Sequence, residues 1–104
     1  MSDLDGYLED VRDLACAPLL RILCEQVQRL EPEPQSEIGA FGVRFRFDER
    51  VVCELSVFGA LFIARVGPDQ AVDYRVRDVA TAAVALDHIV RVHAALRAAP
   101  AAHA

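Results

Sequence analysis

Cysteine and histidine are the residue types in this chain that most readily carry catalytic chemistry. Three of each occur, namely Cys16, Cys24, Cys53, His88, His93 and His103. A thiolate beside an imidazole is an activated nucleophile, and Cys53 would approach His93 if the last helix packs on the inner face of the sheet. No local motif joins the two residues, and His93 falls on the apolar stripe of its helix. We therefore interpret His93 as structural and predict no catalytic pair.

Metal and phosphate sites have spacing requirements that this sequence does not meet. His88 and His93 stand five residues apart, which is a poor spacing for two ligands on one helix. The acidic residues near the N-terminus do not alternate around a glycine turn, as a calcium loop requires. The chain contains neither a Gly-x-Gly-x-x-Gly loop nor a Walker motif. We predict no cofactor, no metal and no enzymatic activity. An acid–base site made of two carboxylates on converging strands has no sequence motif, so spacing does not test for it.

Composition narrows the class of protein further. The chain has 104 residues, which suits one domain, and 54% of them are apolar, which is too many for a disordered chain. No apolar run approaches the roughly 20 residues that a membrane span needs. A formal net charge of −5 argues against general nucleic-acid binding, which needs clustered positive charge. We expect neither a membrane nor a nucleic acid as partner.

The basic residues and the cysteines indicate the type of source genome and the cellular compartment. All 11 basic residues are arginine, which is typical of a GC-rich bacterial or phage genome. The three cysteines are odd in number and form no Cys-x-x-Cys pair, so we expect free thiols in a reducing compartment. The N-terminal sequence does not have the pattern of a signal peptide. These features together predict a cytoplasmic protein.

Hydrophobic spacing predicts a helix at each end of the domain. Apolar residues recur every three or four positions over residues 3–30, and Pro18 interrupts them, so we expect a kink there or the start of a second helix. Residues 31–36 form a polar connector. The last helix is predicted over residues 79–97, with Asp78 as its N-cap.

Between the helices the apolar period changes to two. Strands are predicted over residues 41–47, 51–58, 60–66 and 71–77. Short turns between them favour an antiparallel meander. The expected fold is a two-layer α+β domain over residues 1–97: an N-terminal helix kinked near Pro18, a four-stranded antiparallel sheet and a C-terminal helix. Residues 98–104 are expected to be a disordered tail.

Two hairpin registers bury apolar residues and pair opposite charges at the same time. They align Phe45 with Cys53, Val43 with Leu55, Phe41 with Val57 and Arg44 with Glu54 in the first hairpin, and Val66 with Val72, Ala64 with Tyr74 and Arg65 with Asp73 in the last.

These registers leave an apolar strip, rimmed by arginine, on the outer face of the sheet. The strip is Val52, Phe58, Leu61 and Ile63, and the rim is Arg44, Arg46, Arg75 and Arg77. If both helices cover the inner face, the strip is exposed and marks an interface. If one helix packs on each face, the strip belongs to the core. With Phe58, the arginines would also suit a stacking platform for nucleic acid, which the acidic composition disfavours.

Acidic residues of the N-terminal helix form a second candidate contact. Residues 1–37 hold nine acids and three arginines, whereas residues 38–104 are close to neutral. An acidic helix attracts a basic partner or mimics phosphates. The acidic candidates are Asp5, Glu9, Asp10 and Asp13.

In size, acidity and order of elements the chain is similar to some phage-encoded anti-CRISPR proteins and to small immunity proteins. The stretches Phe47-Asp48-Glu49-Arg50-Val51-Val52 and Leu61-Phe62-Ile63 resemble the strand core of type III secretion chaperones, which usually carry a helix between the strands. We expect a non-catalytic bacterial or phage protein that masks the surface of a partner protein. The alternatives are a chaperone-like homodimer and a small enzyme or ligand-binding domain.

Overall fold

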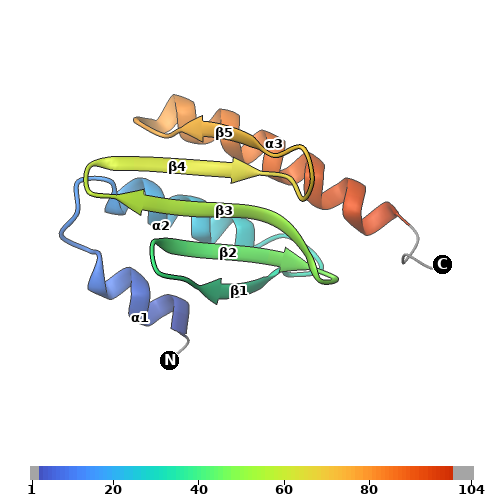
Figure 1. Ribbon diagram of the computed structural model, residues 1–104, viewed down its shortest axis with the longest axis horizontal. Helices are drawn as coiled ribbons and strands as arrows, with labels where there is room; N and C mark the ends of the chain where they lie inside the picture. The colour runs from blue at the N-terminus through green and yellow to red at the C-terminus, as the bar shows by residue number, and fades with distance from the viewer. Residues whose placement is uncertain (1–2, 100–104) are drawn as a thin grey trace.

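The computed structural model describes residues 3–99, which form helices packed on an antiparallel sheet (Figure 1). The helices are α1 (Asp3–Asp10), α2 (Ala17–Gln28) and α3 (Val79–Ala98). The strands are β1 (Gln35–Ile38), β2 (Gly42–Phe47), β3 (Arg50–Phe58), β4 (Leu61–Val66) and β5 (Val72–Arg75). They lie in the order β1-β2-β3-β4-β5. The predicted α+β class and antiparallel meander are confirmed, but the predicted number of four strands is wrong.

The additional strand is β1, which begins inside the predicted polar connector of residues 31–36 and continues beyond it. It pairs with β2 from Gln35 opposite Arg46 to Ile38 opposite Val43. Its first three residues are exposed, so it has no alternation of apolar and polar side chains. Backbone hydrogen bonding to β2, rather than burial of its own side chains, makes this segment a strand.

The N-terminal segment is two helices rather than one kinked helix. Residues 12–15 are exposed, so no packing holds the chain between α1 and α2 in a helix. Pro18 stands in the first turn of α2, where its missing N–H breaks no helical hydrogen bond. The second of the two expectations at Pro18 is therefore correct, and the continuous kinked helix is wrong. α1 lies beside β1, while α2 packs against α3 behind the sheet (Figure 1).

The core lies between the inner face of the sheet and the two longer helices.

Both predicted registers are present: Phe45 is opposite Cys53, and Val66 is opposite Val72. A β-bulge shifts the register of β2 and β3 after Phe45, and one residue of β3 is left without a cross-strand partner. That residue, Val52, was predicted on the outer face but is fully buried in the core.

Phe41 also departs from the alternation expected of the first hairpin. It was predicted to point inward opposite Val57, but its side chain is 60% exposed. The strand begins only at Gly42, where an added Cβ would overlap the carbonyl group of Leu55. Phe41 precedes the strand, and its ring stacks on Phe58 instead of following the inward positions.

α3 begins as predicted and ends one residue later than predicted. The Asp78 carboxylate accepts a hydrogen bond from the Thr81 N–H (2.8 Å), and the Thr81 hydroxyl accepts one from the Asp78 N–H (3.0 Å). This capping box lowers the pKa of Asp78 below its ordinary value, chiefly through the bond from the Thr81 backbone. Ala98, predicted as tail, closes the helix. Residues 100–104 of the predicted tail, with His103, lie outside the described residues.

By length and composition, α3 is apolar enough to cross a membrane, a property that the sequence analysis did not assign to it. Its inward side packs on the sheet and contacts β2, β3, β4 and β5. The residues buried there are Ala82, Ala85, Ile89, His93 and Leu96. These contacts bury 28% of the apolar stretch of α3, and the described residues leave the rest partly or wholly uncovered.

We predict that Glu49→Gly stabilises the protein by about 1 kcal/mol, because glycine does not carry the cost of the left-handed conformation. Asp48 and Glu49, between β2 and β3, have φ of 53° and 66°, a left-handed pair in which glycine is preferred at the second position. Chemical denaturation of the variant would measure the change. Ala60→Gly is the matched control, because Ala60 holds the second position of the next hairpin without a positive φ. That variant should lose stability, and an equal gain in both variants would contradict the prediction.

Candidate interaction surface on the outer face of the sheet

The outer face of the sheet is not crossed by any helix of residues 3–99. α2 and α3 lie behind the sheet, and α1 lies at its β1 edge (Figure 1). This arrangement decides whether the predicted apolar strip belongs to the core or is exposed at the surface. Its members Phe58, Leu61 and Ile63 are exposed or half-buried, whereas Val52 lies in the core.

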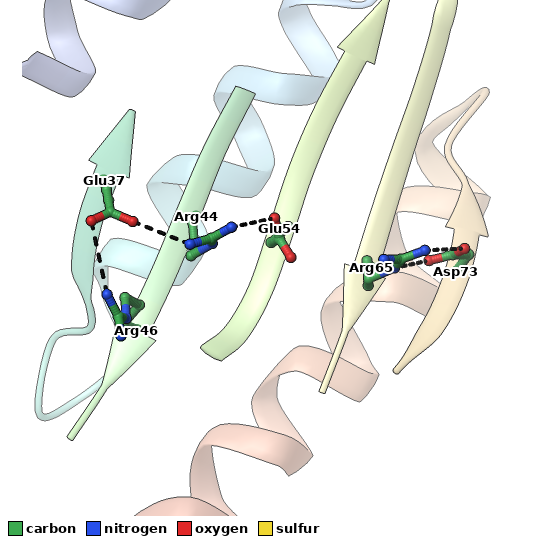
Figure 2. Close-up of polar contacts among 6 residues, drawn as sticks. All are labelled: Glu37, Arg44, Arg46, Glu54, Arg65 and Asp73. Atoms are coloured by element: carbon green, nitrogen blue, oxygen red, sulfur yellow. Dashed lines mark hydrogen bonds and ion pairs between the residues drawn. The ribbon is translucent and has the colours of Figure 1, made fainter. Parts of the chain in front are cut away.

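A row of alternating charges crosses the outer face from one edge to the other. Each strand contributes one residue, and each residue is the cross-strand partner of the next. In order from β1 to β5 they are Glu37, Arg44, Glu54, Arg65 and Asp73 (Figure 2). We call these five residues the charge row. The pairs Arg44–Glu54 and Arg65–Asp73 were predicted, whereas Glu37 was missed because β1 has no apolar signal.

Ion pairs join most of the charge row. Arg44 lies between Glu37 (3.4 Å) and Glu54 (3.3 Å). Arg65 donates two hydrogen bonds to Asp73, at 2.8 and 3.2 Å, and this contact lowers the pKa of the Asp73 carboxyl. Such exposed pairs contribute about 0–1 kcal/mol each. Their main effect is on register, because a slip by one residue would break the whole row.

An apolar cluster lies on the outer face between the charge row and the β3–β4 turn. Its residues, which we call the outer patch, are Phe41, Phe58, Leu61 and Ile63. The rings of Phe41 and Phe58 stack at 4.9 Å between centroids and remain 60% and 47% exposed. Phe58 was predicted here, whereas Phe41 was missed, because it precedes the strand instead of following its alternation.

The two phenylalanines border a hollow of about 380 Å³. Gly42 and Ser56, which are opposite each other on β2 and β3, line it together with charged residues of the charge row. Because neither residue has a large side chain, the face is recessed at this point. The hollow is thus apolar on its phenylalanine side and charged on the other.

The four arginines predicted to rim the strip differ in their surroundings. Arg44 and Arg46 both lie beside Glu37, so β1 neutralises them in part. Arg75 is opposite Ile63 on β5, and Arg77 follows two residues later. Both are exposed, and among residues 3–99 neither forms an ion pair. The positive charge available to a partner is therefore on the β5 side.

The acidic candidates lie away from the exposed arginines on the β5 side. Asp5, Glu9 and Asp10 are exposed on α1, and Asp13 is exposed just after it. α1 contacts β1, at the edge of the sheet opposite to β5 (Figure 1). Glu9 forms an ion pair with Arg12 at 2.7 Å. The acidic candidates thus lie at the edge opposite to Arg75, next to the strands β1 and β2, of which β2 carries Arg44 and Arg46.

The thiols are in surroundings that suppress nucleophilic chemistry. Burial raises the pKa of Cys24 to about 12 and raises that of Cys53 still further. A reactive cysteine has the opposite property, a pKa lowered by a nearby positive charge or a helix N-terminus. Both side chains belong to the core. They act in this fold as small apolar residues.

The described histidines both have structural contacts. His93 Nε2 donates a hydrogen bond to the carbonyl oxygen of Pro32 (2.8 Å), and its ring packs against Phe47. It thereby joins α3 to the connection before β1. His88 is half-buried, and its Nδ1 lies 2.9 Å from the Tyr74 hydroxyl. Residues 3–99 contain no group of three His, Cys, Asp or Glu side chains that could hold a metal.

Comparison with protein-family models, curated proteins and solved structures gives no match for this chain. Its surface must therefore be interpreted from its own geometry.

The buried thiols predict a loss of stability in alkali. In the unfolded chain they ionise near pH 9, whereas Cys24 and Cys53 stay protonated in the fold. Their raised pKa values stabilise the fold fully below pH 9, and this contribution falls as the pH rises. Each thiol should lower the unfolding free energy by about 1.4 kcal/mol per pH unit above pH 9. Denaturation at several pH values would measure the slope, and a Cys24→Ala, Cys53→Ala variant should have a shallower one, since only Cys16 and Tyr7 keep raised pKa values. Equal slopes in both proteins would contradict the assignment.

Proposed function

We propose that this chain is a non-catalytic protein-binding module that masks the surface of a partner protein with the outer face of its sheet. One observation carries the proposal: the stacked Phe41–Phe58 pair is exposed on a sheet face that no described helix covers. Large aromatic side chains are the residues most enriched in the centres of protein interfaces.

The sheet holds the outer patch in place before a partner arrives. Phe58, Leu61 and Ile63 belong to β3 and β4, which are paired along their length, with Phe58 directly opposite Leu61. A surface held in its bound shape loses little conformational entropy on association. The backbone of Phe41 is also fixed, since its carbonyl accepts a hydrogen bond from the Val57 N–H (2.7 Å).

The charges around the outer patch define the chemistry of the partner. An apolar side chain of the partner would enter the hollow beside Phe41 and Phe58. Acidic side chains of the partner would face Arg75 and Arg77, which have no acidic neighbour bonded to them within the described chain. The charge row would exclude surfaces that place a like charge over Arg44 or Glu54.

Differential capture tests this proposal. The wild-type chain, Phe58→Ala and Ile63→Arg would be immobilised in equal amounts, and proteins retained from a lysate of the source cells would be quantified. Proteins held by the wild-type chain should be lost from both variants. Both variants should stay folded, with unfolding free energies within about 1 kcal/mol of wild type, because the changed side chains face solvent.

Ile22→Arg is the matched control for this experiment. Ile22 is 45% exposed, close to the 47% of Phe58, but it lies on α2 in the opposite layer. This control should retain what the wild-type chain retains. Identical capture by all four proteins would refute the outer face as the contact, as would unfolding of Ile63→Arg, which would show that Ile63 belongs to the core.

A further inference from the structure

The side of α3 that faces away from the sheet has the spacing of a helix–helix contact. Its central residues follow one another at steps of four and three, the heptad pattern. They are Ala80, Val84, Asp87, Arg91, Ala94 and Ala98, which we call the α3 seam. At 100° per residue, the seam is opposite to the residues that α3 buries against the sheet.

The uncovered side of α3 is apolar as well as regularly spaced. Val84 in the seam is 56% exposed, and Val79 and Val90, about a quarter turn from the seam on the side toward α2, are 70% and 42% exposed. Beside them an apolar groove of about 200 Å³ separates α3 from α2, with Leu19, Ile22 and Leu86 among its lining residues. Apart from Asp87 and Arg91, the seam carries apolar side chains, and residues 3–99 leave this side of α3 open.

The charges of the seam are complementary to themselves. Asp87 and Arg91 are the two charged residues of the seam, one helical turn apart, with opposite signs. They form an exposed ion pair at 3.1 Å within the helix. The remaining members of the seam are arranged evenly about this pair: Val84 and Ala94 are equally distant from residue 89, and so are Ala80 and Ala98.

We propose that a second copy of this chain covers the α3 seam, with the two α3 helices antiparallel about a two-fold axis at residue 89. This arrangement places Asp87 opposite Arg91 of the partner subunit, and Arg91 opposite the partner's Asp87. It also places Val84 opposite the partner's Ala94, and Ala80 opposite the partner's Ala98. Every position of the seam then meets a complementary one, as a two-fold interface requires.

The charges decide between the two orientations of the helices. A parallel pair would place Asp87 against the partner's Asp87 and Arg91 against the partner's Arg91, which is repulsive at both levels. Alanines let the two helices approach closely, and the exposed valines supply the apolar area that is removed from water. The outer patch is on the opposite layer, so each copy in the dimer keeps it accessible (Figure 1). The dimer and the proposed function therefore rest on separate surfaces.

Charge reversal with mixing tests the antiparallel dimer. Light scattering after size exclusion should give the mass of a dimer for the wild-type chain. Asp87→Arg makes the seam wholly positive and Arg91→Asp makes it wholly negative, so each variant should dimerise at least about tenfold more weakly. An equimolar mixture of the two should form a heterodimer, because every charge then faces its opposite. Circular dichroism of each variant would verify that α3 is intact.

Two further variants locate the interface without relying on charge at the seam. Val84→Glu should dissociate the dimer, because it places a carboxylate in the apolar part of the seam. Arg75→Asp reverses an exposed charge on β5 and the outer face, and it should leave the dimer unchanged. A wild-type chain that is monomeric at all concentrations would refute the proposal. So would a dimer that Arg75→Asp dissociates and the seam variants do not, or a mixture that fails to associate.

Discussion

Alternation of side chains along the meander is the constraint on which the rest of this structure depends. Each strand from β2 to β4 commits every second residue to the inner face, where α2 and α3 bury them. A slip by one residue would expose Phe45 and Phe62 and bury the charge row. The core and the charge row therefore specify the same register from opposite faces, the first by burial and the second by ion pairing.

The same constraint produces the two surfaces on which function is proposed. Since the inner face is occupied by α2 and α3, the outer patch is left on a rigid sheet with the charge row beside it. α3 can bury only the side that meets the sheet, so its apolar seam remains on the opposite side of the molecule. This two-layer fold leaves one sheet face and one helix face uncovered by the described residues. It therefore has two separate surfaces to which partner proteins can bind.

Residues that suggested chemistry contribute instead to the packing of this fold. Cys24 and Cys53 fill the core, and burial keeps their thiols protonated. His93 and Arg97 donate hydrogen bonds to the carbonyl oxygens of Pro32 and Glu31, and Arg50 donates one to the carbonyl of Leu96, so the end of α3 is joined to the α2–β1 connection and to the start of β3. These contacts hold the long C-terminal helix across the strands, which aligns its seam with solvent.

Features that depend on neighbours along the chain could be predicted from the residue pattern alone. Period-two alternation gave β2 to β5, the capping residues gave the start of α3, and paired charges gave both hairpin registers. Folding of the whole chain was needed to establish β1, which pairs without burying its own side chains, and the inward position of Val52, which depends on a bulge. It also decided the exposure of Phe41 and the side on which the helices pack. Those features depend on contacts between segments that are distant in the sequence. Such contacts cannot be derived from the spacing of residues within one segment.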